Sequence, residues 1–367
     1  MNSVIKRCLA LLLCLLLLMP VSAFAEGEKP FFDTDEIQAM LDAYITQRGL
    51  NPDNISVGYV YTATGDTWYY NADKWYYSAS IYKVPLMMIL AEKEYNGELT
   101  RDSNLKGLTL GQAEELILTY SHNDYAHLMM SVVADTEPDC RELYKNYVDL
   151  PEDYYDPDFH DYSYFTARFM TQVMTTLFNQ PERFPNVIDC LKLAQPEHYF
   201  RVTLGNYEIA QKYGSYEDYS ARQWNHTTGI IYLPHPIILT VMTLNNPTPE
   251  QTIADIAKLF ADYSLALDDR LTQYEQEQEA LRLAAEAAEE EARRQEEERL
   301  AAEAAAPATV SETEKPDAVI QTSAAQVSGS GASQSAVPQT QRLYILGGAT
   351  VLFVALLLIY RIGRRRA

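Results

Sequence analysis

Two apolar stretches near the ends of this 367-residue chain limit where a water-soluble core can form. The first lies within residues 1–25, where Lys6 and Arg7 precede a long apolar run that closes at the small residues of Ala23-Phe24-Ala25. A basic start, an apolar centre and small residues at the end are typical of a cleaved secretory signal peptide. We therefore predict export, with a mature chain that begins at Glu26.

The second stretch, residues 343–360, carries no charge and would span about 27 Å as a helix, enough to cross a bilayer. The tail that follows it, residues 361–367, contains four arginines. Because basic flanks stay in the cytoplasm, the pattern predicts a single-pass transmembrane helix with a cytoplasmic C-terminus. The bulk of the protein would then lie on the extracellular face of the plasma membrane.

The same end of the chain has a second interpretation. The segment Val337-Pro338-Gln339-Thr340-Gln341 loosely resembles a sortase sorting signal, Leu-Pro-x-Thr-Gly, and is followed by the expected apolar stretch and basic tail. Valine and glutamine replace the leucine and glycine of that signal. A plain membrane anchor and sortase processing near Thr340, with attachment to the cell wall, therefore both remain open.

Residues 26–267 have the pattern of a globular domain with mixed helices and strands. Thr34 and Gly49 would begin and end a first helix, and Ile55, Val57, Tyr59 and Tyr61 alternate as one face of a strand. That strand would form a hairpin with 67–70, after a turn at Thr64-Gly65-Asp66. The central part has helical spacing, at 81–95, 110–120, 124–134, 163–179 and 185–193.

Strands return late in this region, at 207–213, 224–233 and 236–243, before a last helix that opens at Thr248. Strands at both ends and helices between them predict an α+β fold, an antiparallel sheet flanked by helices. Residues 268–306 hold 13 acidic residues and five arginines without a sustained heptad, so we predict a long solvated helix in preference to a coiled coil. Residues 307–342, rich in Pro, Ser, Thr, Ala and Gln, would be a disordered linker.

Charge and histidine spacing exclude two classes of function. Asp and Glu total 51 against 29 Lys and Arg, a formal net charge of -22, which argues against a nucleic-acid partner. The six histidines show no His-Glu-x-x-His spacing, so neither a metal site nor another cofactor is expected. Cys140 and Cys190 are the only cysteines after the signal peptide, and we favour two buried thiols over a disulfide.

Ser80-Ile81-Tyr82-Lys83 opens an apolar helical stretch and places Ser80 and Lys83 on one helical face. A serine hydroxyl is a poor nucleophile until a base accepts its proton, and a lysine is such a base when burial lowers its pKa. The start of a helix also provides free N–H groups for a developing oxyanion. Ser80 is thus a candidate nucleophile and Lys83 its candidate base.

Two further segments carry chemistry. Ser121-His122-Asn123 lies between helical runs, where Ser121 would relay a proton and the Asn123 amide would hold a substrate carbonyl. Lys212-Tyr213-Gly214 ends a strand, where the lysine offers a cation for a carboxylate and the glycine allows close backbone approach. Each segment alone is weak evidence of a site.

In this order, the three segments resemble the Ser-x-x-Lys, Ser-Asp-Asn and Lys-Thr-Gly motifs of class A β-lactamases and penicillin-binding proteins. The resemblance continues in the sequence around the motifs over nearly all of residues 33–265. It implies a β-lactamase/transpeptidase-like fold, acylation of Ser80 by a β-lactam or a peptidoglycan peptide, and Lys83 as general base. It further implies proton transfer by Ser121, substrate binding by Asn123 and Lys212, and an oxyanion hole formed by the backbone N–H groups of Ser80 and Ser215.

Three departures from the family pattern bear on the reaction. Tyr213 replaces a threonine, which affects carboxylate recognition, and His122 replaces an aspartate. Residues 124–165 contain no Glu-x-x-Leu-Asn, the segment whose glutamate activates the deacylating water in class A enzymes; Glu152 is the nearest candidate by position. The sequence therefore predicts a serine hydrolase of the β-lactamase type. A D-Ala-D-Ala peptidase or penicillin-binding protein with slow deacylation, and an inactive wall-binding pseudo-hydrolase, remain the alternatives.

Overall fold

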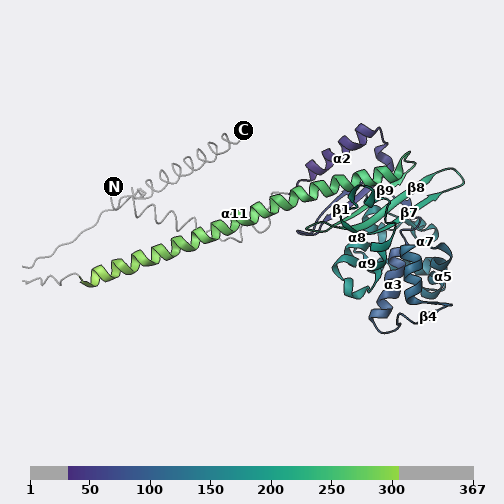
Figure 1. Ribbon diagram of the computed structural model, residues 1–367, viewed down its shortest axis with the longest axis horizontal. Coiled ribbons are helices and arrows are strands. Elements are labelled where there is room, and N and C mark those ends of the chain that lie inside the picture. The colour runs from purple at the N-terminus through teal and green to yellow at the C-terminus, as the bar shows by residue number, and fades with distance from the viewer. Residues whose placement is uncertain (1–31, 306–367) are drawn as a thin grey trace, which may run out of the picture. The chain divides into compact units, whose positions relative to one another are not determined.

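A five-stranded antiparallel sheet forms the centre of the protein in a computed structural model that describes residues 32–305 (Figure 1). The strand order is β2-β1-β9-β8-β7. The strands are β1 (Ile55–Tyr61), β2 (Asp66–Tyr70), β7 (Glu208–Glu217), β8 (Gln223–Tyr232) and β9 (Ile237–Leu244). The predicted antiparallel sheet, with the early hairpin joined to the three late strands, is confirmed.

The first and last strands of the domain meet at the middle of this sheet. In β1, Ile55 pairs with Thr243 and Tyr61 with Ile237 of β9. Every residue of β1 is buried, because both faces of the sheet are covered. Figure 1 shows α2 (Thr34–Arg48) and α11 (Pro249–Ala305) on one face and the remaining labelled helices on the other. Each face thus has its own hydrophobic core.

The helical layer between β2 and β7 carries two of the three segments with candidate chemistry, those around Ser80 and Ser121. Its helices are α3 (Lys83–Tyr95), α4 (Leu110–Glu114), α5 (Asn123–Val133), α6 (Glu137–Tyr144), α7 (Pro157–Tyr162), α8 (Ala167–Asn179) and α9 (Val187–Leu193). The short helix α10 (Phe200–Leu204) packs instead in the core that α2 and α11 cover. A π-helix, η3 (Glu115–Thr119), continues α4, which begins with a capping box between Thr109 and Gln112. Two short strand pairs, β3 (Tyr76–Tyr77) with β6 (Tyr164–Phe165) and β4 (Asn104–Leu105) with β5 (Leu108–Thr109), complete this layer.

Local signals placed some boundaries wrongly. The helix expected over 163–179 begins only at Ala167, because Tyr164 and Phe165 pair with β3 instead. Asp33, not Thr34, caps α2: its carboxylate accepts hydrogen bonds from the N–H groups of Asp35 and Glu36. Gly49 ends that helix as predicted, in the left-handed conformation at φ 64°.

Helix α11 confirms the predicted long C-terminal helix. Its first part packs on the sheet, where Ser264 is 2.7 Å from the Tyr59 hydroxyl and Asp268 accepts a hydrogen bond from Tyr61 at 2.5 Å. Beyond Leu271 nearly all of its described side chains are exposed, and ion pairs such as Arg282 with Glu279 and Glu286 lie along its surface. The exposed part is therefore stabilised by local pairs rather than by packing.

Several predictions concern other parts of the chain. Within residues 32–305, no helix is both long and apolar enough to span a membrane. The predicted signal peptide, linker, sorting segment, transmembrane helix and basic tail all lie outside the described residues. Cys140 on α6 and Cys190 on α9 are free, buried thiols, as predicted.

Candidate active site

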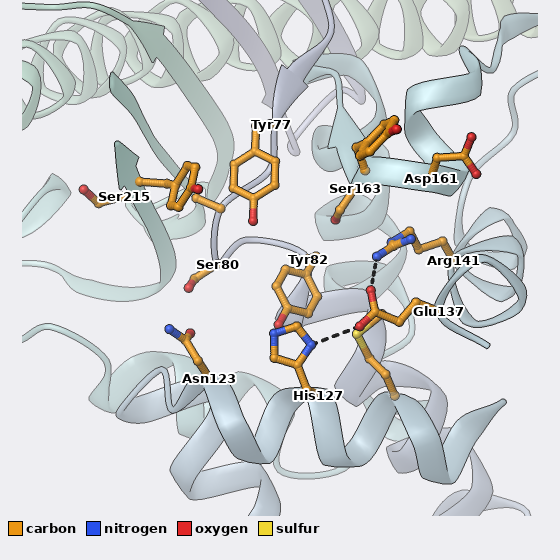
Figure 2. A pocket seen from close by; sticks show the side chains of 14 residues that line it. Tyr77, Ser80, Tyr82, Asn123, His127, Glu137, Arg141, Asp161, Ser163 and Ser215 are labelled. Carbon is orange, nitrogen blue, oxygen red and sulfur yellow. Dashed lines mark hydrogen bonds and ion pairs between the residues drawn. The ribbon is translucent and has the colours of Figure 1, made fainter. Parts of the chain in front are cut away.

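Three chain segments that are distant in sequence meet at the edge of the sheet that is formed by β7. Ser80 lies in the turn between β3 and α3, three residues before the helix begins at Lys83. The sequence had predicted that Ser80 opens this helix. Ser121 follows the π-helix, Asn123 begins α5, and Lys212 and Ser215 lie on β7. A cavity of about 330 Å³ opens there, with Ser80, Asn123 and Ser215 in its walls (Figure 2).

Tight backbone geometry holds the Ser80 turn against β7. Ala79 adopts a left-handed conformation at φ 46°, and the Ser78 hydroxyl is 2.9 Å from that of Ser163. A Cβ added at Gly214 would lie 2.8 Å from the backbone nitrogen of Ser80 and 2.9 Å from the Ser78 carbonyl oxygen. Glycine at 214 is therefore needed for the strand to reach the nucleophile turn, where the proposed oxyanion N–H groups lie.

The Lys83 amine is at the centre of the cluster. Its Nζ is 3.1 Å from Ser80 Oγ, 2.7 Å from the Ser121 carbonyl oxygen and 2.6 Å from Asn123 Oδ1. The carbonyl and amide oxygens can only accept, so they take two hydrogens of the amine. A neutral Lys83 then has its lone pair left for the Ser80 hydroxyl proton, which is the arrangement that a general base requires.

The Ser121 hydroxyl connects the two lysines. Its Oγ lies 3.2 Å from Lys83 Nζ and 2.9 Å from Lys212 Nζ. A hydroxyl has two acceptor lone pairs and one proton, so Ser121 can accept from Lys212 and still donate its own O–H. Ser121 itself adopts φ 59°, a left-handed conformation that is uncommon for serine. A strained backbone thus places a hydroxyl that can pass a proton to a leaving group.

Burial changes the protonation of both lysines. Neither Lys83 nor Lys212 is exposed, and burial lowers the pKa of Lys83 to about 8. The pKa of Lys212 is well below its ordinary value, first because of burial and then because of the nearby Lys83 charge. Among residues 32–305, no carboxylate contributes to either shift. Burial therefore favours the neutral amine at Lys83, as a lysine base needs.

Lys212 and Tyr213 lie behind the cavity rather than in its wall. Lys212 Nζ also donates to the Tyr213 carbonyl oxygen at 3.0 Å and lies 4.3 Å from the centre of the Tyr213 ring. That ring stacks on Tyr199, with ring centres 5.1 Å apart. The Ser215 hydroxyl donates to Asn225 Oδ1 at 2.9 Å. Lys212 thus contacts the site through Ser121, and direct carboxylate binding by it stays a prediction.

Glu152 does not join the site. It lies at the start of a short 3-10 helix, with its side chain 82% exposed and 3.0 Å from Lys145 Nζ. The loop between α6 and α7 directs it to the surface, away from the residues that line the cavity. The expectation of Glu152 as the deacylating base is therefore corrected.

The other end of the cavity consists of residues that sequence analysis did not single out. They include His127 of α5, Glu137 and Arg141 of α6, and Asp161 (Figure 2). One signal was available: His127 follows Asn123 by four residues and so shares its helical face. Within residues 32–305, no group of three or more His, Cys, Asp or Glu side chains is arranged to hold a metal.

Comparison with known proteins agrees with this fold. The model of the beta-lactamase enzyme family matches residues 34–136 and 141–264, more than half of the chain. A β-lactamase from Chitinophaga pinensis is similar in structure, with 16% identity, TM-score 0.51, and coverage of 62% of this chain and 98% of that one. One from Xanthomonas campestris has 15% identity, TM-score 0.52 and coverage of 63% and 98%.

A third similar structure is the TLA-3 extended-spectrum β-lactamase, at 15% identity and TM-score 0.52, covering 63% of this chain and 99% of that one. At these identities the likeness concerns the fold. A comparison with curated proteins found no match. On the family match over both halves of the domain, the chain belongs to the beta-lactamase enzyme family.

Proposed function

We propose that this protein is an exported serine hydrolase that forms an acyl-enzyme at Ser80 with β-lactams or related D-alanyl peptides. The observation that supports it is the contact of one lysine amine with two hydroxyls: Lys83 Nζ lies 3.1 Å from Ser80 Oγ and 3.2 Å from Ser121 Oγ. Lys83 would remove the Ser80 proton, and Ser121 would deliver a proton to the leaving amine. Asn123, with Oδ1 turned to Lys83, has its N–H groups left for a substrate carbonyl.

Labelling with a fluorescent penicillin tests this function. The wild-type protein should take up one label per chain, and Ser80→Ala should take up none. Ser131→Ala, which changes an exposed serine on α5, serves as the control and should label normally. A label that survives Ser80→Ala, or a wild-type protein without a label, contradicts the proposal.

The position of Glu152 favours one alternative, a penicillin-binding protein that deacylates slowly, since the expected base is absent from the site. Nitrocefin separates the two: steady colour formation indicates a β-lactamase, and a single burst indicates a persistent acyl-enzyme.

We further propose attachment to the outer face of the membrane through residues 343–360, with sortase processing near Thr340 as the alternative. N-terminal sequencing that begins at Glu26 would support export.

A further inference from the structure

The cavity wall beyond Asn123 contains a paired histidine and glutamate. His127 lies one helical turn after Asn123 on α5, so both side chains are on the same face of that helix. Both line the cavity that also contains Ser80. Figure 2 shows the imidazole between Asn123 and Glu137, with one ring nitrogen directed at Glu137 and the other turned away from it. The imidazole thus opens to the same cavity as the Ser80 hydroxyl.

Glu137 fixes the tautomer of this histidine. His127 Nδ1 lies 3.1 Å from Glu137 Oε1, and a carboxylate can only accept, so Nδ1 carries the proton and Nε2 keeps its lone pair. Arg141, one turn along α6, in turn makes an ion pair with Glu137. Arg141 is only 5% exposed and also donates to the His160 carbonyl oxygen, so it holds the carboxylate in place. A base oriented by a fixed third group is the usual arrangement in hydrolases that use histidine.

Water has access to this pair. The His127 side chain is 59% exposed and that of Glu137 is 47% exposed, whereas Lys83 is buried and its donors are committed to Ser121 and Asn123. We propose that His127 is the general base that activates water for hydrolysis of the acyl-enzyme, and that Glu137 is its positioning residue. This inference rests on the proposed acylation of Ser80.

The step conserves atoms and charge. The oxygen of a water molecule adds to the ester carbonyl carbon at Ser80 while His127 Nε2 takes one of its protons. The resulting tetrahedral intermediate collapses, and the bond between the carbonyl carbon and Ser80 Oγ breaks. Ser80 Oγ then takes up the proton that the imidazolium returns, and the product leaves as a carboxylic acid. Serine is regenerated and no other reactant is consumed.

The test measures acylation and deacylation separately. Fluorescent penicillin labelling gives the acylation rate, and mass spectrometry of the protein after excess β-lactam is removed gives the rate at which the adduct is lost. His127→Ala should acylate at the wild-type rate and lose the adduct about 100-fold more slowly, the usual effect of removing a general base. Free imidazole should restore much of the loss, which a purely structural role would not allow. Glu137→Gln should slow adduct loss about tenfold, and Glu137→Asp should recover part of it.

His198 provides a matched control, because its Nδ1 lies 2.6 Å from Glu250 in a similar pair outside the cavity. His198→Ala should leave both rates unchanged. Adduct loss at the wild-type rate in His127→Ala, or a wild-type adduct that never clears, overturns the role of His127 while acylation at Ser80 stands. If the wild type takes up no label at all, the proposed function itself fails, so the two failures are distinguishable.

Discussion

Lys83 can act as a base only after it has lost its own proton, and its surroundings favour that form. Burial without a carboxylate partner lowers its pKa to about 8. An ordinary lysine, with a pKa of about 10.4, would be almost wholly charged at neutral pH. Burial also lowers the pKa of Lys212, whose amine donates to Ser121. The site thus obtains reactivity from desolvation, at two positions on different elements.

This protonation predicts the pH dependence of acylation. Below pH 8 the neutral amine is the minor form of Lys83, so the acylation rate should rise about tenfold per pH unit and level off above pH 8. Penicillin labelling rates from pH 5.5 to 9 measure this. A rate that is flat with pH, or falls as pH rises, would contradict the assignment of Lys83 as base.

Gly214 makes a second prediction at the scale of one residue. Gly214→Ala places a methyl group against backbone atoms of Ser80 and Ser78, which cannot move aside as a side chain can. A shift of about 1 Å in the nucleophile turn should slow acylation about 100-fold. Gly111→Ala is the control, since its new methyl would meet the flexible end of Arg101. Equal labelling rates for both variants would show that the close approach at Gly214 is not needed.

At the scale of elements, α11 consists of two parts with different roles. The part up to Asp268 supplies partners for the buried hydroxyls of Tyr59 and Tyr61, while the remainder is exposed. A chain that ends after Gln278 should keep nearly the melting temperature of the longer protein, because it loses only exposed side chains and ion pairs, which contribute little to stability.

A chain that ends after Asp262 should behave differently. It lacks Ser264, Leu267 and Asp268, so two tyrosine hydroxyls lose their partners at about 1–3 kcal/mol each, and a core leucine is lost as well. Thermal unfolding followed by circular dichroism compares the two truncations. Equal melting temperatures would show that this part of α11 does not stabilise the domain.

The sequence predicted the elements whose signal is local. The strand β9 is a long apolar run, and Ser80 and Lys83 are neighbours along one turn, so pattern alone located them. The short helices α6, α7 and α10 were missed, because so few residues carry little periodicity, although α9, with seven residues, was located. Which charges of α6 face the cavity depends on packing against α5, which no local pattern contains. The prediction that Glu152 is the deacylating base was wrong for the same reason, because position along the chain did not determine position in space.

For the molecule as a whole, one buried histidine makes the free energy of unfolding depend on pH. His226 on β8 bonds the Tyr77 carbonyl oxygen through Nε2 at 2.9 Å and accepts from the Thr243 N–H. Burial lowers its pKa to about 4 from an ordinary value of 6.5. Between those values the unfolded chain binds the additional proton, so the free energy of unfolding decreases as pH falls.

We expect His226 to account for about 3 kcal/mol of stability lost between pH 6.5 and 4. Urea unfolding at several pH values should show a weaker acid dependence in His226→Gln, whose amide can still donate to Tyr77. If His226→Gln retains the wild-type dependence, the protonation of another group is responsible.

The two buried thiols make unfolding of this protein chemically visible. Cys140 lies near Tyr144 within α6, and Cys190 lies on α9, whose backbone accepts a hydrogen bond from Thr119 of the π-helix. Burial raises the pKa of each to about 11, so neither reacts while its helix stays in place. Alkylation rates at the two sulfurs would therefore time the opening of two separate regions beside the active site. Equal rates would mean that these regions open together, and unequal rates would identify the one that opens first.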